Sequence, residues 1–268
     1  MSESLHIDEA RGILRITIDR QARMNAIDLA TMAELSAAIT AATTRTDLRV
    51  IVLTGAGTAF CTGADLAAAA ASGGNEATPE VVMDTANGVI RAILDAPLPV
   101  IAEVNGPAAG VGASIALAAD LIYAADSAYL LLPFTSIGLM PDGGATAVVA
   151  AAMGRVRAAE LALLGGRLPA AAAAAAGLIT GCVPDADLSE QVTGIATKLA
   201  AGPRRALQLT KAAVNAATLT ELDAALAREK EGQVELLTSA DFLEGMTAML
   251  TRRAPNFTGA PTPIADPA

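Results

Sequence analysis

Two short glycine-rich stretches decide how this sequence folds: Phe60-Cys61-Thr62-Gly63-Ala64-Asp65-Leu66 and Asn105-Gly106-Pro107-Ala108-Ala109-Gly110-Val111-Gly112. Each follows a β-branched, apolar run, at residues 50–54 and 100–104, that predicts a buried strand, and each precedes a helix-forming segment. At such junctions, unpaired backbone N–H groups point the same way and the helix dipole reinforces them. Two junctions that converge on one carbonyl oxygen would form an oxyanion hole. The sequence therefore predicts a site that polarises a carbonyl group.

The composition excludes several classes of protein. The 268 residues suffice for one large α/β domain or for a domain with an appendage, and 53% of them are hydrophobic. The net charge of −10 argues against a nucleic-acid partner and against an anionic membrane surface, because both require a basic footprint. No apolar run reaches about 18 residues without a charge or a turn signal, so we expect no membrane-spanning helix.

The cysteines and the N-terminus indicate the compartment. Cys61 and Cys182 lie far apart, with neither a CxxC pattern nor a His/Cys cluster, so two reduced packing thiols and no metal site are expected. Met1-Ser2-Glu3-Ser4 is not followed by the charged and apolar regions typical of a signal peptide, so we expect none. A cytoplasmic protein is the resulting prediction. His6 is the single histidine, which excludes Ser/His/Asp and Cys/His nucleophile systems.

Strand-like and helix-like segments alternate, which predicts an α/β fold with parallel strands covered by helices. Strands are expected at residues 12–18, 50–54, 100–104, 121–124 and 129–132, and helices at residues 28–42 and 81–94. After residue 144 the pattern is helical almost to the end. From about Leu188 it is helix-only, so we divide the chain into a core, residues 1–187, and a helical region for subunit packing, residues 188–268.

Two alanine tracts are expected to be short helices. Residues 170–176 end at Gly177, which is a typical residue after a helix C-terminus. Residues 67–71 precede Ser72-Gly73-Gly74-Asn75, so this helix could fray into a loop. Such a loop would either be a simple surface connection or act as a lid over a substrate.

Several separated motifs, in order, resemble the crotonase (enoyl-CoA hydratase/isomerase) superfamily. Besides the two opening stretches, they are Ile16-Thr17-Ile18-Asp19-Arg20 through Met24-Asn25-Ala26, Ile137-Gly138-Leu139-Met140-Pro141-Asp142-Gly143-Gly144, Glu244-Gly245-Met246 and residues 252–257. The resemblance covers roughly residues 5–258. It implies a crotonase-type spiral of ββα repeats with a C-terminal helical trimerisation region. It also implies acyl-CoA thioester substrates and a homotrimer or a hexamer built as a dimer of trimers.

The resemblance assigns the oxyanion donors to the backbone N–H groups of Ala64 and Val111. Loss of one such donor typically costs about 100- to 1,000-fold in rate. Val111 stands where relatives often have glycine, and its branched side chain would crowd the carbonyl group. Gly110, directly before it, is expected to contact the substrate.

The family's hydratases use two glutamates to position and deprotonate water, and this chain lacks both. Ser114 stands at the first position and Phe134 at the second. Serine cannot replace a carboxylate as a general base near neutral pH, and phenylalanine carries no proton to exchange. Both side chains are therefore expected to contact the substrate without adding water to it efficiently.

Asp142 is the remaining candidate for acid–base catalysis. It lies in a Pro-Asp-Gly turn, so a plain turn residue is the alternative. In dienoyl-CoA isomerases, aryl-CoA dehalogenases and the ring-epoxide isomerases of phenylacetate breakdown, a carboxylate at the matching position reaches the substrate. Residues 105–110 and 137–144 are most similar to the last group. A single base can remove a proton from one carbon and return it to another, and apolar neighbours would raise its pKa.

The anionic coenzyme A moiety requires local positive charge. Arg20 and Arg23, next to Met24, are candidates, and Arg252 aligns with a basic residue that in relatives reaches coenzyme A across a subunit interface. The alternative for each arginine is a solvated surface position. Thr62 and Leu66 are expected to line the pantetheine and adenine region. Asp65 is more simply a helix cap.

No cofactor is expected besides the coenzyme A of the substrate. The sequence has neither a complete dinucleotide fingerprint nor a phosphate-binding Gly-Lys-Ser/Thr loop. Three functions remain open: an enoyl-CoA isomerase that uses Asp142, in fatty-acid or aromatic-acid metabolism; an enoyl-CoA hydratase; and an acyl-CoA-binding protein without chemistry. The sequence does not distinguish a linear acyl group from a ring.

Overall fold

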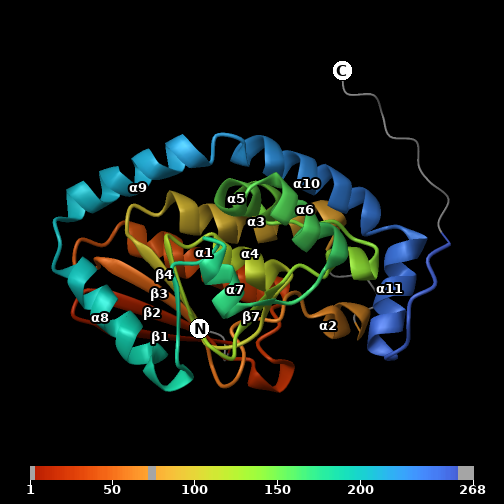
Figure 1. Ribbon diagram of the computed structural model, residues 1–268, viewed down its shortest axis with the longest axis horizontal. Coiled ribbons are helices and arrows are strands. Elements are labelled where there is room, and N and C mark those ends of the chain that lie inside the picture. Colours follow the sequence, from red (N-terminus) through yellow and green to blue (C-terminus); the bar gives the residue numbers. More distant parts are fainter. Residues whose placement is uncertain (1–3, 72–76, 259–268) are drawn as a thin grey trace.

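The computed structural model of the chain describes residues 4–71 and 77–258 (Figure 1). The loop suggested as a lid, Ser72 to Asn75, lies outside the described residues. Most of the fold consists of one large sheet, a small second sheet, and helices that cover both.

The large sheet contains six strands in the order β1 (Leu5–Ala10), β2 (Ile13–Ile18), β3 (Val50–Gly55), β4 (Val100–Val104), β6 (Leu121–Ala125) and β9 (Gly181–Val183). β1 and β2 are antiparallel, and every later pair is parallel. All residues of β3 and β4 are buried, which explains why both read as uninterrupted apolar runs. β4 ends directly before the second glycine-rich stretch and β3 ends five residues before the first, and a bridge between Cys61 and Ala108 places the two stretches side by side.

The small sheet contains β5 (Ala108–Ala109), β7 (Tyr129–Leu131) and β8 (Leu168–Pro169). β8 and β9 interrupt the region after residue 144, which we predicted to be helical. Both are too short for a periodic pattern, and they become strands because β7 and β6 offer them pairing partners. The strands predicted at 100–104, 121–124 and 129–132 are present with ends shifted by no more than one residue.

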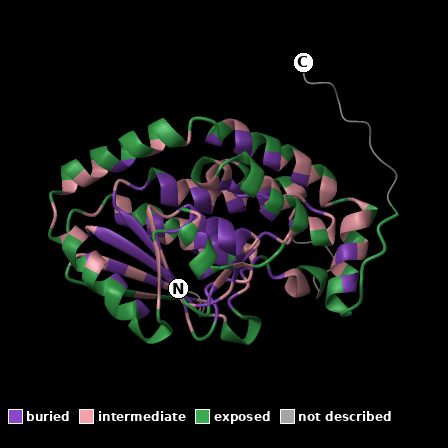
Figure 2. Ribbon diagram, in the orientation of Figure 1, coloured by how far each residue is buried: buried purple, intermediate pink, exposed green. Residues whose placement is uncertain are grey.

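The helices before residue 188 lie between and around the sheets. They are α1 (Leu29–Thr43), α2 (Leu66–Ala71), α3 (Pro79–Asp95), α4 (Val111–Leu117), α5 (Ala145–Met153), α6 (Arg155–Leu164) and α7 (Ala170–Ala175), with single 3-10 turns η1 (Gln21–Arg23), η2 (Phe134–Ile137) and η3 (Asp185–Asp187). Every residue of α4 is buried, and Figure 2 shows it in the centre of the molecule. No helix in the described part of the chain is long and apolar enough to cross a membrane.

From Leu188 to residue 258, where the described part ends, the structure has four α-helices: α8 (Leu188–Ala200), α9 (Arg204–Thr218), α10 (Leu222–Leu236) and α11 (Ala240–Leu250). The helix-only region begins at the predicted residue, and its first helix, α8, packs on strands of the large sheet. In Figure 1, α9 and α10 arch over the other helices and α11 stands at one end, near α2. α10 packs against α3 and α5, and α11 packs against η2.

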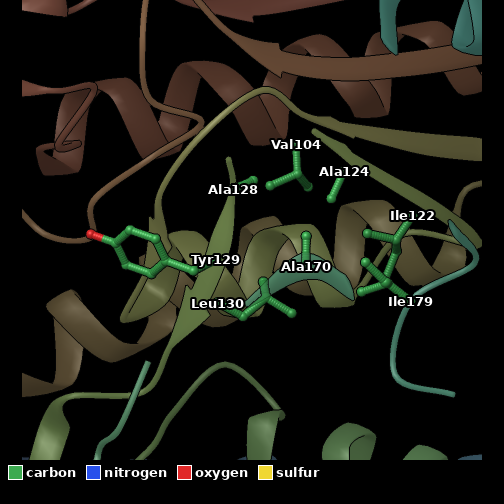
Figure 3. A pocket seen from close by; sticks show the side chains of 8 residues that line it. All are labelled: Val104, Ile122, Ala124, Ala128, Tyr129, Leu130, Ala170 and Ile179. Atoms are coloured by element: carbon green, nitrogen blue, oxygen red, sulfur yellow. The ribbon is translucent and has the colours of Figure 1, made fainter. Parts of the chain in front are cut away.

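A small apolar gap lies where the two sheets meet (Figure 3). It is lined by Val104, Ile122, Ala124, Ala128, Tyr129, Leu130, Ala170 and Ile179, and it leaves no room for a water molecule. Figure 3 shows the Tyr129 hydroxyl group turned away from the other side chains. We assign the gap to core packing, because a dry space of this size offers no polar group to a ligand.

A buried ion pair ties α9 to the core. The Lys211 Nζ atom lies 2.8 Å from Asp120 Oδ2 and donates to the carbonyl oxygens of Ile93 and Leu98 at 2.9 and 3.3 Å. Asp120 also accepts from the Val100 N–H at 2.7 Å, so the same carboxylate holds the start of β4. Burial lowers the pKa of Lys211 and raises that of Asp120, and the attraction between them opposes both shifts.

Replacing Lys211 with Met is expected to lower the free energy of unfolding by about 3 kcal/mol, because the buried Asp120 carboxylate loses its cation. Denaturant unfolding followed by circular dichroism measures this change. Lys198→Met, at an exposed position of α8, is the matched control and should change stability little. Equal unfolding midpoints for the two variants would contradict a stabilising role for the pair.

Candidate active site

The two glycine-rich stretches meet at Gly63 and Gly110. A Cβ atom on Gly110 would lie 3.8 Å from the Gly63 Cα atom, and one on Gly63 would lie 3.0 Å from the Ala109 carbonyl oxygen. Both glycines have positive φ angles, +103° and +54°, which L side chains rarely adopt. Glycine is therefore required at both positions, and the residues that follow, Ala64 and Val111, are brought to the same place.

The Ala64 backbone is clamped on both sides by Ile27. The Ile27 N–H donates to the Gly63 carbonyl at 2.8 Å, and the Asp65 N–H donates to the Ile27 carbonyl at 2.9 Å. Between these bonds, the N–H of Ala64 has no acceptor among the described residues. It is therefore available to a ligand.

Val111 is the first residue of α4, so its N–H lies at the N-terminus of this helix. Gly110 precedes it as the N-cap and supplies no side-chain acceptor, and no described residue accepts from the Val111 N–H. Unpaired N–H groups at a helix N-terminus favour a negative charge in front of them. Ala64 and Val111 line the same pocket, so the structure brings together the two groups expected to form the oxyanion hole.

The pocket has a volume of about 1430 Å³. Its walls are mainly apolar and come from α1, α2, α3, η2 and α11, with charged side chains at Arg23, Asp28, Asp65, Asp142 and Arg253. A large apolar cavity with a few polar groups is typical of a small-molecule site. This pocket can take a large, mostly apolar ligand that also carries charged groups.

Asp142 lines this pocket from the turn between η2 and α5, and it is only 8% exposed. Its Oδ2 atom accepts from Gln233 Nε2 at 2.8 Å, whereas Oδ1 has no hydrogen-bond partner in the described structure. Burial raises the pKa of Asp142 to about 7; the Gln233 hydrogen bond opposes this shift, and the nearby Glu229 charge adds to it. A carboxyl group with this pKa exchanges protons at neutral pH.

The two positions that lack the hydratase glutamates differ in their placement. Phe134 is buried and lines the pocket, and its Cζ atom would lie 4.0 Å from a Cβ atom on Gly110. Ser114 lies outside the pocket lining, and its hydroxyl group donates to the Asp142 carbonyl oxygen at 2.8 Å. Ser114 thus holds the turn that carries Asp142, instead of the substrate contact we expected.

Arg20 lies outside the pocket lining as well. Its guanidinium group, only 17% exposed, donates to the Ala26 carbonyl oxygen and lies 2.9 Å from Asp28 and 3.2 Å from Asp65. Asp65 in turn accepts from the Ala68 N–H, which confirms that it caps α2. Arg20 therefore links the segment at residues 26–28 to Asp65, the residue after Ala64. Its positive charge is already balanced by the carboxylates of Asp28 and Asp65.

The other residues expected at the coenzyme A end divide between pocket and surface. Arg23, Met24, Thr62 and Leu66 line the pocket, and the Thr62 hydroxyl group donates to the Met24 carbonyl at 3.1 Å. Arg252 is exposed and outside the lining.

The lining cation at the C-terminal end is Arg253, which sequence reasoning missed. Its guanidinium group pairs with Glu244 at 2.5 Å. Because Arg252 and Arg253 are adjacent in the sequence, only the path of the chain after α11 distinguishes them.

Sequence reasoning also missed Glu229 and Gln233 on α10, both of which are buried. They continue the spacing of Leu222 and Leu226 along one face of the helix. The sequence contained one signal for them, namely polar residues at positions of α10 that are otherwise apolar. Such residues become buried only where they find hydrogen-bond partners.

Two unpaired N–H groups and a buried carboxyl group line one apolar pocket, and groups of these types have the chemistry to stabilise an oxyanion and to exchange a proton. A sequence profile of the enoyl-CoA hydratase/isomerase family matches residues 8–260. The chain belongs to this family, whose members act on acyl-CoA thioesters, and the predicted crotonase resemblance and fold are confirmed.

Three similar proteins illustrate the family. A probable enoyl-CoA hydratase of Rhodobacter capsulatus is 44% identical over 96% of this chain and 98% of its own length. The 1,2-epoxyphenylacetyl-CoA isomerase of Escherichia coli is 37% identical over 93% of this chain and 96% of its own. The crystal structure of an enoyl-CoA hydratase from Mycobacterium avium subsp. paratuberculosis superposes with a TM-score of 0.88 at 44% identity, over 96% of this chain and 99% of that one.

Proposed function

We propose that this protein isomerises an enoyl-CoA thioester by moving its double bond, with Asp142 as the proton carrier. The proposal rests on one observation: the buried carboxyl group of Asp142 and two N–H groups without acceptors, those of Ala64 and Val111, line the same pocket. This set of groups matches the needs of a proton shift next to a thioester carbonyl.

The proposed reaction is balanced within the substrate and Asp142. The ionised carboxylate removes a proton from C2 of a 3-enoyl thioester, and the C–H electron pair moves into the thioester to form a dienolate. The N–H groups of Ala64 and Val111 stabilise the negative oxygen. The protonated Asp142 then returns the proton to C4, which leaves a conjugated 2-enoyl thioester. No electrons leave the substrate, so this chemistry needs no cofactor besides the substrate's own coenzyme A.

Hydration is the second candidate, because several relatives carry that name. Two carboxylates that activate water would have to come from the pocket, where the acids besides Asp142 in the described lining are Asp28 and Asp65. Both are paired with Arg20, and each caps a helix, at Thr31 and at Ala68. Neither is available as a second base, which favours isomerisation.

The identity of the acyl group is a finer proposal. A ring-epoxide substrate is the variant favoured by the 37% identity to the 1,2-epoxyphenylacetyl-CoA isomerase. The same donors would polarise that thioester, and a buried acid is again the group that moves a proton. Arg23 and Arg253 are proposed to attract the coenzyme A phosphates, with Thr62 and Leu66 beside the pantetheine chain.

Assembly into a trimer, or a hexamer made of two trimers, through residues 188–268 stays a prediction. Within that region, the exposed apolar side chains Leu209 and Val214 on α9 are candidates for such contacts; Val156, Leu163 and Leu164 on α6, before residue 188, are also exposed.

Ultraviolet absorbance with a 3-enoyl-CoA tests the proposal, because the conjugated enoyl thioester adds absorbance to that of the adenine ring and the thioester, which the substrate already has. We expect the signal to grow, and kcat/KM to rise with pH along a limb of pKa about 7, since Asp142 must be ionised to accept a proton. A level profile from pH 5 to 9 would contradict Asp142 as the base. Loss of absorbance from a 2-enoyl-CoA, without activity on the 3-enoyl-CoA, would identify a hydratase; ligand binding without turnover would identify a binding protein.

A further inference from the structure

One face of α10 forms hydrogen bonds with the turn that contains Asp142. Glu229 and Gln233 lie four residues apart on this face and are each only 1% exposed. α10 approaches the turn so closely that a Cβ atom on Gly232 would lie 2.3 Å from the Met140 sulfur. Side chains buried this completely need partners, and both find them in residues 140–146.

Gln233 holds the Asp142 carboxyl group on one side only. Its Nε2 atom donates to Asp142 Oδ2 at 2.8 Å, and its Oε1 atom accepts from the Met140 N–H at 3.2 Å. Because one planar amide is bound at both ends, the orientation of the carboxyl group is set by the backbone two residues earlier. Oδ1 is left without a partner among the described residues.

Glu229 holds the chain on the other side of Asp142. Its Oε2 atom accepts from the Gly144 N–H at 2.7 Å, and Oε1 accepts from the Thr146 N–H at 2.9 Å and the Thr146 hydroxyl group at 2.5 Å. Gly144, the N-cap of α5, supplies no capping side chain of its own. Glu229 therefore caps α5 from another helix and places a charge near Asp142.

We propose that Gln233 and Glu229 are positioning residues for Asp142: Gln233 fixes Oδ2 so that Oδ1 is the oxygen that exchanges the proton, and Glu229 fixes the turn. This inference deepens the proposed function and rests on it for the role of the proton. The geometry itself does not depend on the identity of the reaction.

Gln233 and Glu229 have opposite effects on the pKa of Asp142. The Gln233 hydrogen bond stabilises the ionised carboxylate and lowers its pKa, and the Glu229 charge raises it. The other elements packed against the turn present Ser114 from α4 and Ile90 from α3, and Phe134 comes from η2; none of these titrates near neutral pH. Burial raises the pKa of Glu229, and the hydrogen bonds from Thr146 and Gly144, together with the charge of the exposed Arg228 on α10, oppose this shift.

Infrared difference spectroscopy of the full-length protein tests the proposal without using activity. The C=O stretch of a protonated buried carboxyl group is followed against pH, and its loss in Asp142→Asn assigns it. In Gln233→Leu the Asp142 pKa is expected to rise by about one unit, because a hydrogen bond to the charged form is lost. In Glu229→Gln it is expected to fall by about one unit, because a like charge is removed. Glu231→Gln, which removes an exposed charge from the same helix, should leave it unchanged.

The same variants are then followed by kcat/KM against pH with the 3-enoyl-CoA. The rising limb should move with the infrared pKa, upward in Gln233→Leu and downward in Glu229→Gln, and kcat should change more than KM. General loosening of the fold would shift both variants the same way, and this outcome overturns the proposal, as does an unchanged Asp142 pKa in both. Shifted infrared pKa values in a protein inactive on 3-enoyl-CoA would support the positioning role and reject the proposed reaction.

Discussion

Asp142→Asn is expected to lower kcat for conjugation of a 3-enoyl-CoA by about 100- to 10,000-fold, the usual range for a lost acid–base group. Asparagine keeps the shape and can still accept the Gln233 hydrogen bond, but it cannot carry a proton at neutral pH. Ultraviolet absorbance measures the rate, and titration with an unreactive acyl-CoA measures binding. The dissociation constant should change little, because the N–H groups of Ala64 and Val111 and the apolar walls stay in place.

Stability provides the control for this variant. The folded pKa of Asp142, about 7, lies above its ordinary value of 3.8, so the wild type loses stability as pH rises from about 4 to about 7. Asparagine has no such dependence, so the unfolding free energy of the variant should exceed that of the wild type at pH 8. A rate within tenfold of the wild type in a folded variant would remove Asp142 from the mechanism.

Val111→Pro is expected to lower kcat by about 100- to 1,000-fold, because it removes one of the two oxyanion donors. The substitution suits the backbone, since Val111 is the first residue of α4, a position where proline is common. Its N–H has no acceptor in the described structure, so no internal hydrogen bond is lost. The measurement is again the conjugation rate at saturating substrate.

Val111→Ala is the matched control, because it also removes the branched methyl groups of valine but keeps the N–H. Its kcat should stay within a few fold of the wild type, or rise if the valine crowds the carbonyl group. Equal losses in the alanine and proline variants would show that the side chain matters and the N–H does not. Circular dichroism and thermal unfolding establish that both variants are folded.

The sequence alone predicted the parts of the fold that depend on local patterns. The buried strands β3 and β4 were visible as continuous β-branched runs, and α1 and α3 by their spacing of apolar residues. The short strands β8 and β9 were missed because two or three residues carry no period. They form only where β7 and β6 provide an edge.

The same division holds within the site. The glycines at 63 and 110 marked the proposed oxyanion hole, because their positive φ angles disfavour other residues and that constraint is local. The motif at residues 137–144 made Asp142 a candidate for acid–base catalysis. The sequence left open that Asp142 is only a turn residue, and the burial of its side chain in the pocket argues against that alternative. The prediction that Arg20 contacts coenzyme A rested on its positive charge alone. Only the folded chain shows that Asp28 and Asp65 lie beside its guanidinium group.

By itself, the sequence determined the family, the α/β architecture and the residues at the two strand–helix junctions, because strands, turns and positive φ angles follow from neighbouring residues. The tertiary structure alone decided the environment of Asp142. Gln233 reaches it from 91 residues away, and Glu229 reaches the same turn through the docking of α10 on α3 and α5. A pKa near 7 results from burial and from such distant partners, and both exist only when the chain is packed.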